Sequence, residues 1–599
     1  MEKIKTREKV DPALSWDLAK LYPDDEAWEK EFASLEKLLE KFLAFKGRLK
    51  ESPETLRDAY KASDDFEMVL DRLFTYAHLK SDEDTTNSAN KARLDRISEK
   101  AAVFSAQCAW FSPELSSMDE KTFEKFRRHK SLAFYKRSLD NEARYRPHIL
   151  SSPEEKILAR SGNVLGASSG IFSAFNDADL RFPSIRDAKG GKTEVTHGNY
   201  ITLMQSPLRR VRKSAFQALH GTFRAFRNTL SSTLYANTKK NILLAELRNI
   251  GSARSASLFS DNIPLSVYDS LIDAVHEKIG YLHRYMKIRA RELSLRKLDM
   301  YDIYNPLIPE CDERVTWPEA VRYVKEALAP LGKEYGRIVE KAFSERWMDV
   351  EENRGKRSGA YSGGCYGSLP YILMTFKGDL NSVSTLAHEM GHSIHSFLSH
   401  ASQPYHYAYY RIFVAEVAST TNEILLHEYL MKNAPSDKVR AYLLNQLLDE
   451  VRGTLFRQTM FAEFEREIYD EAAGGVPLTA DKLDEIYYNL NTFYYGKSVK
   501  ADKLIASEWS RIPHFYRSFY VYKYATGFSA AVALSRNILA GNTEAYLDFL
   551  KAGGSKDVLD IMKDAGVDFT TRAPVVAALE YFNERLSAFD RILKKKDGK

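Results

Sequence analysis

Apolar residues recur at three- and four-residue steps along most of the chain, as they do in amphipathic helices. One such run consists of Leu35, Leu38, Leu39, Phe42 and Leu43. A proline that follows a serine predicts a helix start, because serine caps helices and proline fits the first turn. Such pairs are Ser52-Pro53, Ser112-Pro113 and Ser152-Pro153. The pattern predicts successive helices over residues 15–160 and again after about 206 and 381, and therefore a mainly α-helical protein.

Two segments interrupt this pattern and predict short strands. Residues 180–185 alternate as a strand does, and Gly190-Gly191 predicts a hairpin turn into residues 193–196. Residues 354–380 are rich in glycine and include an apolar, partly β-branched run at 371–376. The second segment therefore predicts a small β-sheet just before residue 381.

The change of pattern near residue 200 predicts a domain boundary. At 599 residues the chain exceeds the length at which single hydrophobic cores stop growing. We expect an N-terminal helical lobe over residues 1–200 and a second domain over residues 201–599, which contains the candidate site described below.

Composition excludes several classes of protein. The 87 Lys and Arg residues nearly balance the 82 Asp and Glu residues, so no basic face for nucleic acid is expected, and residues 594–596 predict a solvated lysine tail. No apolar run is long enough to span a membrane, and the charged N-terminus does not resemble a signal peptide. Cys108, Cys311 and Cys365 are too few and too far apart for a disulfide framework, which indicates a reducing, cytoplasmic location.

The segment His388-Glu389-Met390-Gly391-His392 carries the candidate chemistry. An HExxH pattern this short also arises by chance, so its context has to fit. Apolar residues over 382–398 predict an amphipathic helix, with Asn381 or Ser382 as its N-cap. His388 and His392 then project together from another face, where two imidazoles can hold a metal ion, and Glu389 lies close enough to act on a metal-bound water.

A catalytic zinc ion requires a third protein ligand. A third histidine ten residues after His388, as in metzincins, is excluded because that position holds Leu398. His395 lies one turn further along the helix, and we expect it to pack or to support a ligand. Glu416, in the otherwise apolar run 413–418, is the better candidate, with an ordinary solvated residue as the alternative. Glu423, seven residues later on the same face, is expected to orient a ligand histidine.

An aromatic cluster at residues 512–524 suggests hydrogen-bond donors for a reaction intermediate. On a helix, Tyr516, Tyr520 and Tyr524 would align at four-residue steps, and His514 could add another donor. A packed aromatic stripe explains the same residues equally well.

Several motifs together resemble the thimet oligopeptidase-like family of zinc metallopeptidases. These are HEMGHSIHS, FVAEVASTTNEILL, HFYRSFYVYKYATG, SWDLAKLYP, ASLFSDNIP, YSGGCYG and PYILM. The resemblance covers nearly the whole chain. It implies a mainly α, two-lobed molecule with a deep central cleft and a small β-sheet near the HExxH helix.

The same resemblance implies a function and a site. One zinc ion per chain would be held by His388, His392 and Glu416, with Glu389 as general base on the zinc-bound water. The substrates would be short peptides cleaved at internal bonds. His514, Tyr520 and Tyr524 would act in catalysis, and Tyr361, Gly363, Gly364 and Tyr516 would contact the peptide. The segment 361–367 would be an edge strand that pairs with the peptide backbone.

Two other functions share these features. A peptidase that removes C-terminal dipeptides would need a cation that grips a free carboxylate, which the sequence does not locate. A non-catalytic peptide-binding protein usually lacks the general base or a ligand, and this chain retains Glu389 and all three candidate ligands. Cobalt or manganese could replace zinc, and the sequence does not indicate an oligomeric state.

Overall fold

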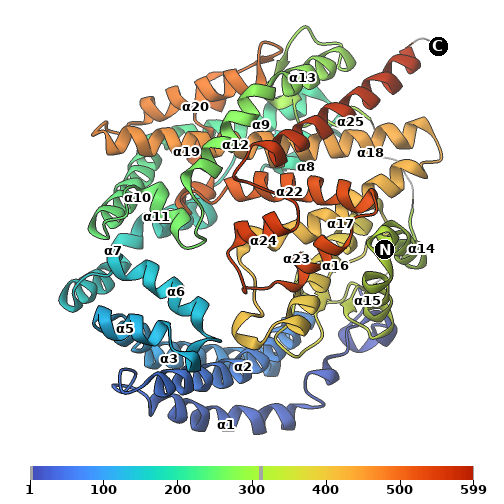
Figure 1. The fold of residues 1–599 in the computed structure, drawn as a ribbon. Coiled ribbons are helices and arrows are strands. Elements are labelled where there is room, and N and C mark those ends of the chain that lie inside the picture. The colour runs from blue at the N-terminus through green and yellow to red at the C-terminus, as the bar shows by residue number, and fades with distance from the viewer. Residues whose placement is uncertain (1–3, 309–313, 598–599) are drawn as a thin grey trace. The chain divides into compact units, whose positions relative to one another are not determined.

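A computed structural model describes residues 4–308 and 314–597, so Cys311 lies outside the described residues. The described chain is mainly α-helical with short strands, as the sequence predicts (Figure 1). No helix within the described ranges is long and apolar enough to cross a membrane.

The chain forms two compact units, each made of three segments. The first unit comprises residues 1–149, 313–429 and 534–566, and the second comprises residues 150–312, 430–533 and 567–599. This is a division by spatial contacts and not the sequential division at residue 200, which stays a prediction.

The helices of the first unit are α1 (Asp25–Leu43), α2 (Pro53–Glu83), α3 (Ser88–Cys108), α4 (Phe111–Ser116), α5 (Glu120–Arg127), α6 (Lys136–Tyr145), α14 (Trp317–Leu328), α15 (Gly332–Ser344), α16 (Leu380–Ser402), α23 (Glu544–Lys551) and α24 (Val558–Asp564). Its strands are β4 (Met348–Asp349), β5 (Tyr361–Gly363) and β6 (Tyr371–Leu373). Helix α17 (Ile412–Lys432) begins in this unit and ends in the second.

The helices of the second unit are α7 (Ser152–Ser173), α8 (Tyr200–Met204), α9 (Arg209–Ala225), α10 (Arg227–Leu247), α11 (Ala253–Phe259), α12 (Leu265–Lys278), α13 (Gly280–Glu292), α18 (Asp437–Val451), α19 (Arg457–Ala473), α20 (Ala480–Tyr495), α21 (Lys503–Ala506) and α25 (Ala573–Asp597). Its strands are β1 (Ser184–Arg186), β2 (Lys192–Glu194), β3 (Leu298–Asp299) and β7 (Val499–Lys500). Helix α22 (Tyr522–Leu539) begins here and ends in the first unit.

Helix starts follow the serine–proline pairs only in part. The Ser52 side chain accepts a hydrogen bond from the Thr55 amide and caps α2, with proline in its first turn. At 152–153 the capping residue is Ser151, one position earlier than predicted. The pair at 112–113 lies inside α4, which begins after Trp110, so the predicted helix start there is wrong by two residues.

The predicted end of helix near residue 160 is also wrong, because α7 continues to Ser173. Its glycines at 162, 166 and 170 have no heavy atom within 4 Å of a β-carbon position, so they stand on open sides of the helix. Each glycine costs about 1 kcal/mol of helix propensity. Packing of α7 along α10 offsets this cost. The hairpin after it is confirmed, since β1 and β2 pair antiparallel with Ile185 opposite Thr193.

A core of buried aromatic and aliphatic side chains joins α1, α2 and α3, which lie side by side in the first unit (Figure 1). Tyr371 and Leu373 of β6 belong to the same core. The predicted small sheet is confirmed, with strand order β4-β6-β5. Strand β6 pairs parallel to β4 and antiparallel to β5, so β5 is an edge strand of this sheet.

Candidate metal and peptide site

Helix α16 carries the HExxH segment in the predicted orientation. Asp379 caps the helix by accepting a hydrogen bond from the Ser382 amide at 2.7 Å, so the predicted caps Asn381 and Ser382 are both wrong. The buried stripe consists of Val383, Leu386, Ala387, Met390, Ile394 and Leu398, all at most 4% exposed. His388 and His392 are only partly buried and project from another face of α16.

Helix α17 packs against α16 at the position of Gly391. A β-carbon there would lie 2.6 Å from the Ser419 Cα and 2.7 Å from the Ala418 carbonyl oxygen, so only glycine permits this approach. Asn422 of α17 donates a hydrogen bond to the Ala387 carbonyl at 3.1 Å. These contacts fix the two helices against each other at residues 387 and 391, each of which directly precedes one of the two histidines.

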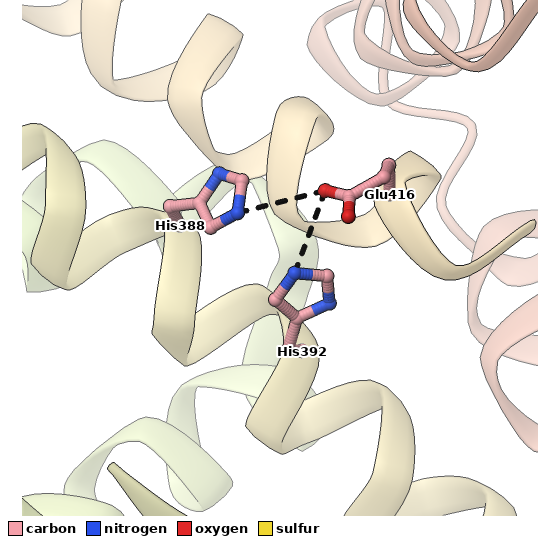
Figure 2. Close-up of side chains that lie close together, drawn as sticks. All are labelled: His388, His392 and Glu416. Carbon is pink, nitrogen blue, oxygen red and sulfur yellow. Dashed lines mark ion pairs between the residues drawn. The ribbon is translucent and has the colours of Figure 1, made fainter. Parts of the chain in front are cut away.

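This packing brings Glu416 to the two histidines. Its Oε2 atom lies 3.6 Å from Nε2 of His388 and 3.5 Å from Nε2 of His392. Figure 2 shows the Glu416 carboxylate, from a separate helix, directed at both imidazole rings. Glu416 does not face an apolar core, although its neighbours in sequence are apolar, because 49% of its side chain is exposed. Its neighbours Phe413, Val414 and Val417 bury the apolar faces of the helix.

The three residues fit a zinc ion. Their ligand atoms all lie within 4.8 Å of one another and comprise two imidazole nitrogens and one carboxylate oxygen. This is a donor set of catalytic zinc sites, in which ligands sit about 2.0–2.1 Å from the ion. Two ligands of a tetrahedral centre are then about 3.3–3.4 Å apart, close to the 3.5 and 3.6 Å observed.

Glu423 contacts the second ring nitrogen of His388. Its Oε2 atom lies 3.2 Å from Nδ1 of His388, on the ring edge away from Glu416. A carboxylate in this position orients a ligand histidine and fixes its tautomer. Burial alone would lower the pKa of His388, but the Glu423 hydrogen bond and the negative charges of Glu423, Glu389 and Glu416 raise it to about 9. The hydrogen bond with His392 lowers the pKa of Glu416.

Glu389 is buried beside this cluster. Its side chain belongs to α16 and the residue is only 6% exposed. Burial raises the pKa of the Glu389 carboxyl, and the charges of Glu416 and Glu423 act in the same direction against those of His388 and His392. A carboxylate with a raised pKa is a stronger proton acceptor.

His395 lies outside the cluster. Its ring stacks on Tyr410 with centroids 3.7 Å apart and also contacts Phe549. Burial lowers the pKa of His395 to about 3, so the ring is neutral at physiological pH. Of the two expectations for His395, the structure shows packing contacts.

The glycine-rich segment lies along α16. The hydroxyl of Ser362 in β5 is 2.8 Å from the hydroxyl of Ser393, the residue that follows His392. Tyr361 donates a hydrogen bond to Asp82 of α2 at 2.8 Å. Gly363 pairs with Tyr371 within the sheet, and Gly364 follows the strand. The resemblance implies an edge strand over residues 361–367, and the observed strand, Tyr361–Gly363, lies next to the helix that carries both histidines.

In the second unit, the aromatic cluster is not one helix. Residues 513–516 form a short 3-10 helix, α22 begins only at Tyr522, and Phe519 between them has a φ of 56°. The predicted four-residue alignment is therefore wrong. His514, Tyr520 and Tyr524 nevertheless come together, with ring centroids 5.4–6.3 Å apart. The Tyr524 hydroxyl is 3.4 Å from Nε2 of His514.

Tyr516 is separate from this group. Its hydroxyl lies 2.7 Å from that of Thr233, and its ring stacks on Phe172 at 4.5 Å. Burial, opposed by this hydrogen bond, raises the pKa of Tyr516 to about 12. Burial also lowers the pKa of His514, with a further contribution from Arg517.

Sequence reasoning missed Asn422 and the role of Gly391. One signal was available, because Ser419-Thr420-Thr421-Asn422 is a run of four polar residues in an otherwise apolar helix segment. All four are buried. Small and hydrogen-bonding side chains of this kind permit close contacts between helices. Which helix they contact cannot be predicted from their positions in the sequence.

Comparisons with known proteins show the family of this chain. Residues 202–581 match the model of peptidase family M3, and residues 114–182 match that of oligopeptidase F. The chain is 44% identical over 593 residues to oligopeptidase PepF of Bacillus subtilis, covering 98% of this chain and 88% of the relative. It is 40% identical to group B oligopeptidase PepB of Streptococcus agalactiae, covering 98% of both chains.

Solved structures give the same result. Oligoendopeptidase-F from Enterococcus faecium has a TM-score of 0.73 at 37% identity and covers 95% of this chain and 99% of its own. The crystal structure of a peptidase from Chlamydophila abortus has a TM-score of 0.93 at 35% identity. The match covers 98% of this chain and 100% of that chain. These similarities confirm the family resemblance indicated by the motifs.

Proposed function

The chain belongs to peptidase family M3, and from this premise we propose that it is a zinc-dependent endopeptidase that hydrolyses internal bonds of short oligopeptides. The observation that carries the proposal is the convergence of His388, His392 and Glu416 beside the buried Glu389. The B. subtilis and S. agalactiae relatives are named as oligopeptidases, which supports short peptides as the substrate class. A cytoplasmic location stays a prediction from the cysteine content.

His388, His392 and Glu416 would hold one zinc ion per chain, and Glu423 would keep His388 in the orientation that directs Nε2 at the ion. When bound, zinc supplies a Lewis acid that polarises the scissile carbonyl and makes water more acidic. The chain's own residues then have three tasks, which are to move protons, to align the peptide and to stabilise the developing oxyanion.

Glu389 would move the protons. As general base it accepts a proton from the attacking water, and as general acid it passes that proton to the departing amine. Its burial and raised pKa favour the first step, because the carboxylate accepts a proton more readily than an exposed glutamate does.

Strand β5 would align the peptide. Because β5 is an edge strand, an extended peptide can add to it through main-chain hydrogen bonds. Gly363 and Gly364 have no side chain to obstruct this pairing, and Tyr361 is held by Asp82 at the start of the strand. Pairing of this kind reads the peptide backbone, so it is compatible with many peptide sequences.

His514, Tyr520 and Tyr524 would stabilise the oxyanion. Phenol hydroxyls are neutral donors, and the three rings are gathered in one group of the second unit. Substrate contact by Tyr516 stays a prediction, since its hydroxyl already pairs with Thr233.

The proposal is tested with a short, internally quenched peptide that is blocked at both termini. Zinc-loaded wild type is expected to cleave it, a chelator to abolish cleavage, and added zinc to restore it. Glu389→Gln should lower kcat by about 10²–10⁴-fold, as loss of a general base does. Glu40→Gln, at an exposed position of α1, is the matched control and should leave kcat unchanged.

Each alternative gives a different result. Absence of cleavage by the zinc-loaded wild type, both of the blocked peptide and of the same peptide with a free C-terminus, would refute the peptidase assignment and leave a peptide-binding protein. Cleavage only of peptides with a free C-terminus, two residues from that end, would show a peptidase that removes C-terminal dipeptides. Undiminished activity of Glu389→Gln would show that another group is the base.

A further inference from the structure

A pocket of about 250 Å³ lies between the glycine-rich segment and α16 in the first unit. Ser362, Gly363 and Gly364 of the candidate peptide-binding edge form one side of it. We propose that this pocket is a specificity subsite, which receives an uncharged apolar or aromatic side chain of the substrate close to the cleaved bond. This inference rests on the proposed function, because it takes the peptide to lie along β5.

Half of the residues that line the pocket have rings or an aliphatic side chain, and the other half are small serine, glycine and cysteine residues. The first group consists of Leu369, Pro370, Phe397, His400, Tyr409 and Tyr410. The His400 and Tyr409 rings meet edge to face at 5.2 Å, and the Tyr410 hydroxyl lies 3.0 Å from that of Ser396. These contacts hold the segment after α16 against the helix, so the pocket has fixed walls on both sides.

The pocket offers no charge to a ligand. None of the described residues that line it is Asp, Glu, Lys or Arg. Burial lowers the pKa of His400 to about 4, so its ring is neutral near pH 7, and burial raises the pKa of the Cys365 thiol. A charged side chain that entered would lose hydration without gaining a counter-charge.

One acid lies behind the pocket wall. Asp71 of α2 accepts hydrogen bonds from the hydroxyls of Tyr405 and Tyr409 at 3.0 and 3.1 Å. The Tyr409 hydroxyl is also 3.3 Å from the Tyr366 amide, which ties the pocket rim to the glycine-rich segment. Both hydroxyls donate to the Oδ2 atom of Asp71, which braces the wall, and Asp71 is not among the residues that line the pocket.

The pocket lies close to the candidate metal site along the same helix. Ser396 and His400 follow His392 by four and eight residues, or about 6 and 12 Å at the rise of an α-helix. An extended peptide advances about 3.3 Å per residue, so the side chain that enters belongs to a residue about two to four positions from the cleaved bond. The volume of about 250 Å³ is below that of sites for whole drug-sized ligands, and suits a single side chain.

The test uses blocked, internally quenched peptides that differ at one position at a time and carry Ala, Leu, Phe, Asp or Lys there. For zinc-loaded wild type, one position is expected to favour Leu or Phe over Asp and Lys by about 10- to 200-fold in kcat/KM. Ser396→Leu, which fills the pocket, should abolish the preference for Phe at that position, measured as the ratio of kcat/KM for the Phe peptide to kcat/KM for the Ala peptide. Ser402→Leu, at an exposed serine on the same helix, is the matched control.

A second variant tests the subsite independently, in case Ser396→Leu does not fold. Tyr409→Ala changes a residue that is 45% exposed at the pocket rim and should widen the accepted range of side chains. Equal kcat/KM for peptides with charged and apolar residues at every position would overturn the proposed subsite. A preference for Lys would also overturn it, as would a preference for Phe that Ser396→Leu leaves unchanged.

Failure of the peptidase function would be recognised separately. In that case wild type cleaves none of the peptides, and equilibrium binding of the same set, followed by fluorescence anisotropy, reports the side-chain preference without cleavage. A Phe preference in binding that Ser396→Leu removes would support the subsite even then, and its absence would refute it.

Discussion

Gly391 of α16 lies so close to Ser419 of α17 that a β-carbon on residue 391 would come within 2.6 Å of the Ser419 Cα. Residue 391 stands between Glu389 and His392, and Ser419 stands one turn after Glu416. The Ser419 hydroxyl also lies 3.3 Å from Oε2 of Glu416. The close contact of the two helices is therefore what sets the position of the third candidate ligand relative to the first two.

Gly391→Ala is expected to weaken zinc binding and stability together. The added methyl meets backbone atoms of Ser419 and Ala418, which cannot rotate away as a side chain would. Overpacking of this kind costs about 1–3 kcal/mol, and the displaced α17 would carry Glu416 away from the histidines. Zinc affinity by chelator competition and unfolding in denaturant measure the two effects.

Gly336→Ala is the matched control. This glycine is also within a helix, α15, and has nothing within 4 Å of its β-carbon position. Alanine there is expected to raise the free energy of unfolding by up to about 1 kcal/mol and to leave zinc affinity unchanged. Equal zinc affinity in Gly391→Ala and wild type would show that the helix contact does not position Glu416.

Glu423→Ala is expected to lower zinc affinity by about 10- to 100-fold, as loss of a supporting carboxylate typically does. The His388 ring would lose its Nδ1 partner at 3.2 Å and the constraint on its tautomer. Competition with a chelator of known affinity measures the change, and Glu40→Ala serves as the exposed control. Unchanged zinc affinity would assign Glu423 a structural role only.

Glu465 is expected to make stability depend on pH. The residue is fully buried, and its carboxylate accepts a hydrogen bond from the Phe519 amide at 2.8 Å. Phe519 itself has a φ of 56°. Burial, opposed by that hydrogen bond, raises its pKa from 4.5 to about 8. Between these values the unfolded chain releases the proton and the folded chain keeps it. The free energy of unfolding therefore falls as pH rises from 4.5 to 8, and is level above that.

Glu465→Gln should remove this dependence, because the amide oxygen still accepts from Phe519 and carries no charge. We expect the variant to gain on the order of a few kcal/mol over wild type at pH 8, and little at pH 4.5. Denaturant unfolding at both pH values measures the difference. A constant difference at all pH values would show that Glu465 does not titrate in this range.

Tyr520→Phe and Tyr524→Phe are each expected to lower kcat by about 10²–10³-fold with little change in KM, as loss of an oxyanion donor does. Tyr516→Phe is the internal comparison. It should leave kcat unchanged and cost about 0.5–1.5 kcal/mol of stability through the lost hydrogen bond with Thr233. A kcat loss confined to Tyr516→Phe would reverse this assignment.

Local features were predicted best where neighbouring residues in sequence decide them. The α16 stripe of Val383, Leu386 and Met390 is buried as its spacing indicates, and the glycine-rich turn after residue 186 forms the predicted hairpin. Errors arose where packing overrides propensity, as when α7 continues through three glycines along α10. The predicted alignment of the tyrosines is wrong because Phe519 has a left-handed backbone conformation, which interrupts the helical path before α22 begins.

The pairing of His388 with His392 follows from the amino-acid sequence alone, since a four-residue step places both on one face of any α-helix. It also made Glu416 and Glu423 candidates by their type and spacing. The packing of the folded chain is needed to show that the Glu416 carboxylate lies beside both imidazoles and that Glu423 contacts the Nδ1 side of His388. Those distances depend on how closely α17 approaches α16, and that approach is set by the missing side chain of Gly391 and the backbone of Ser419.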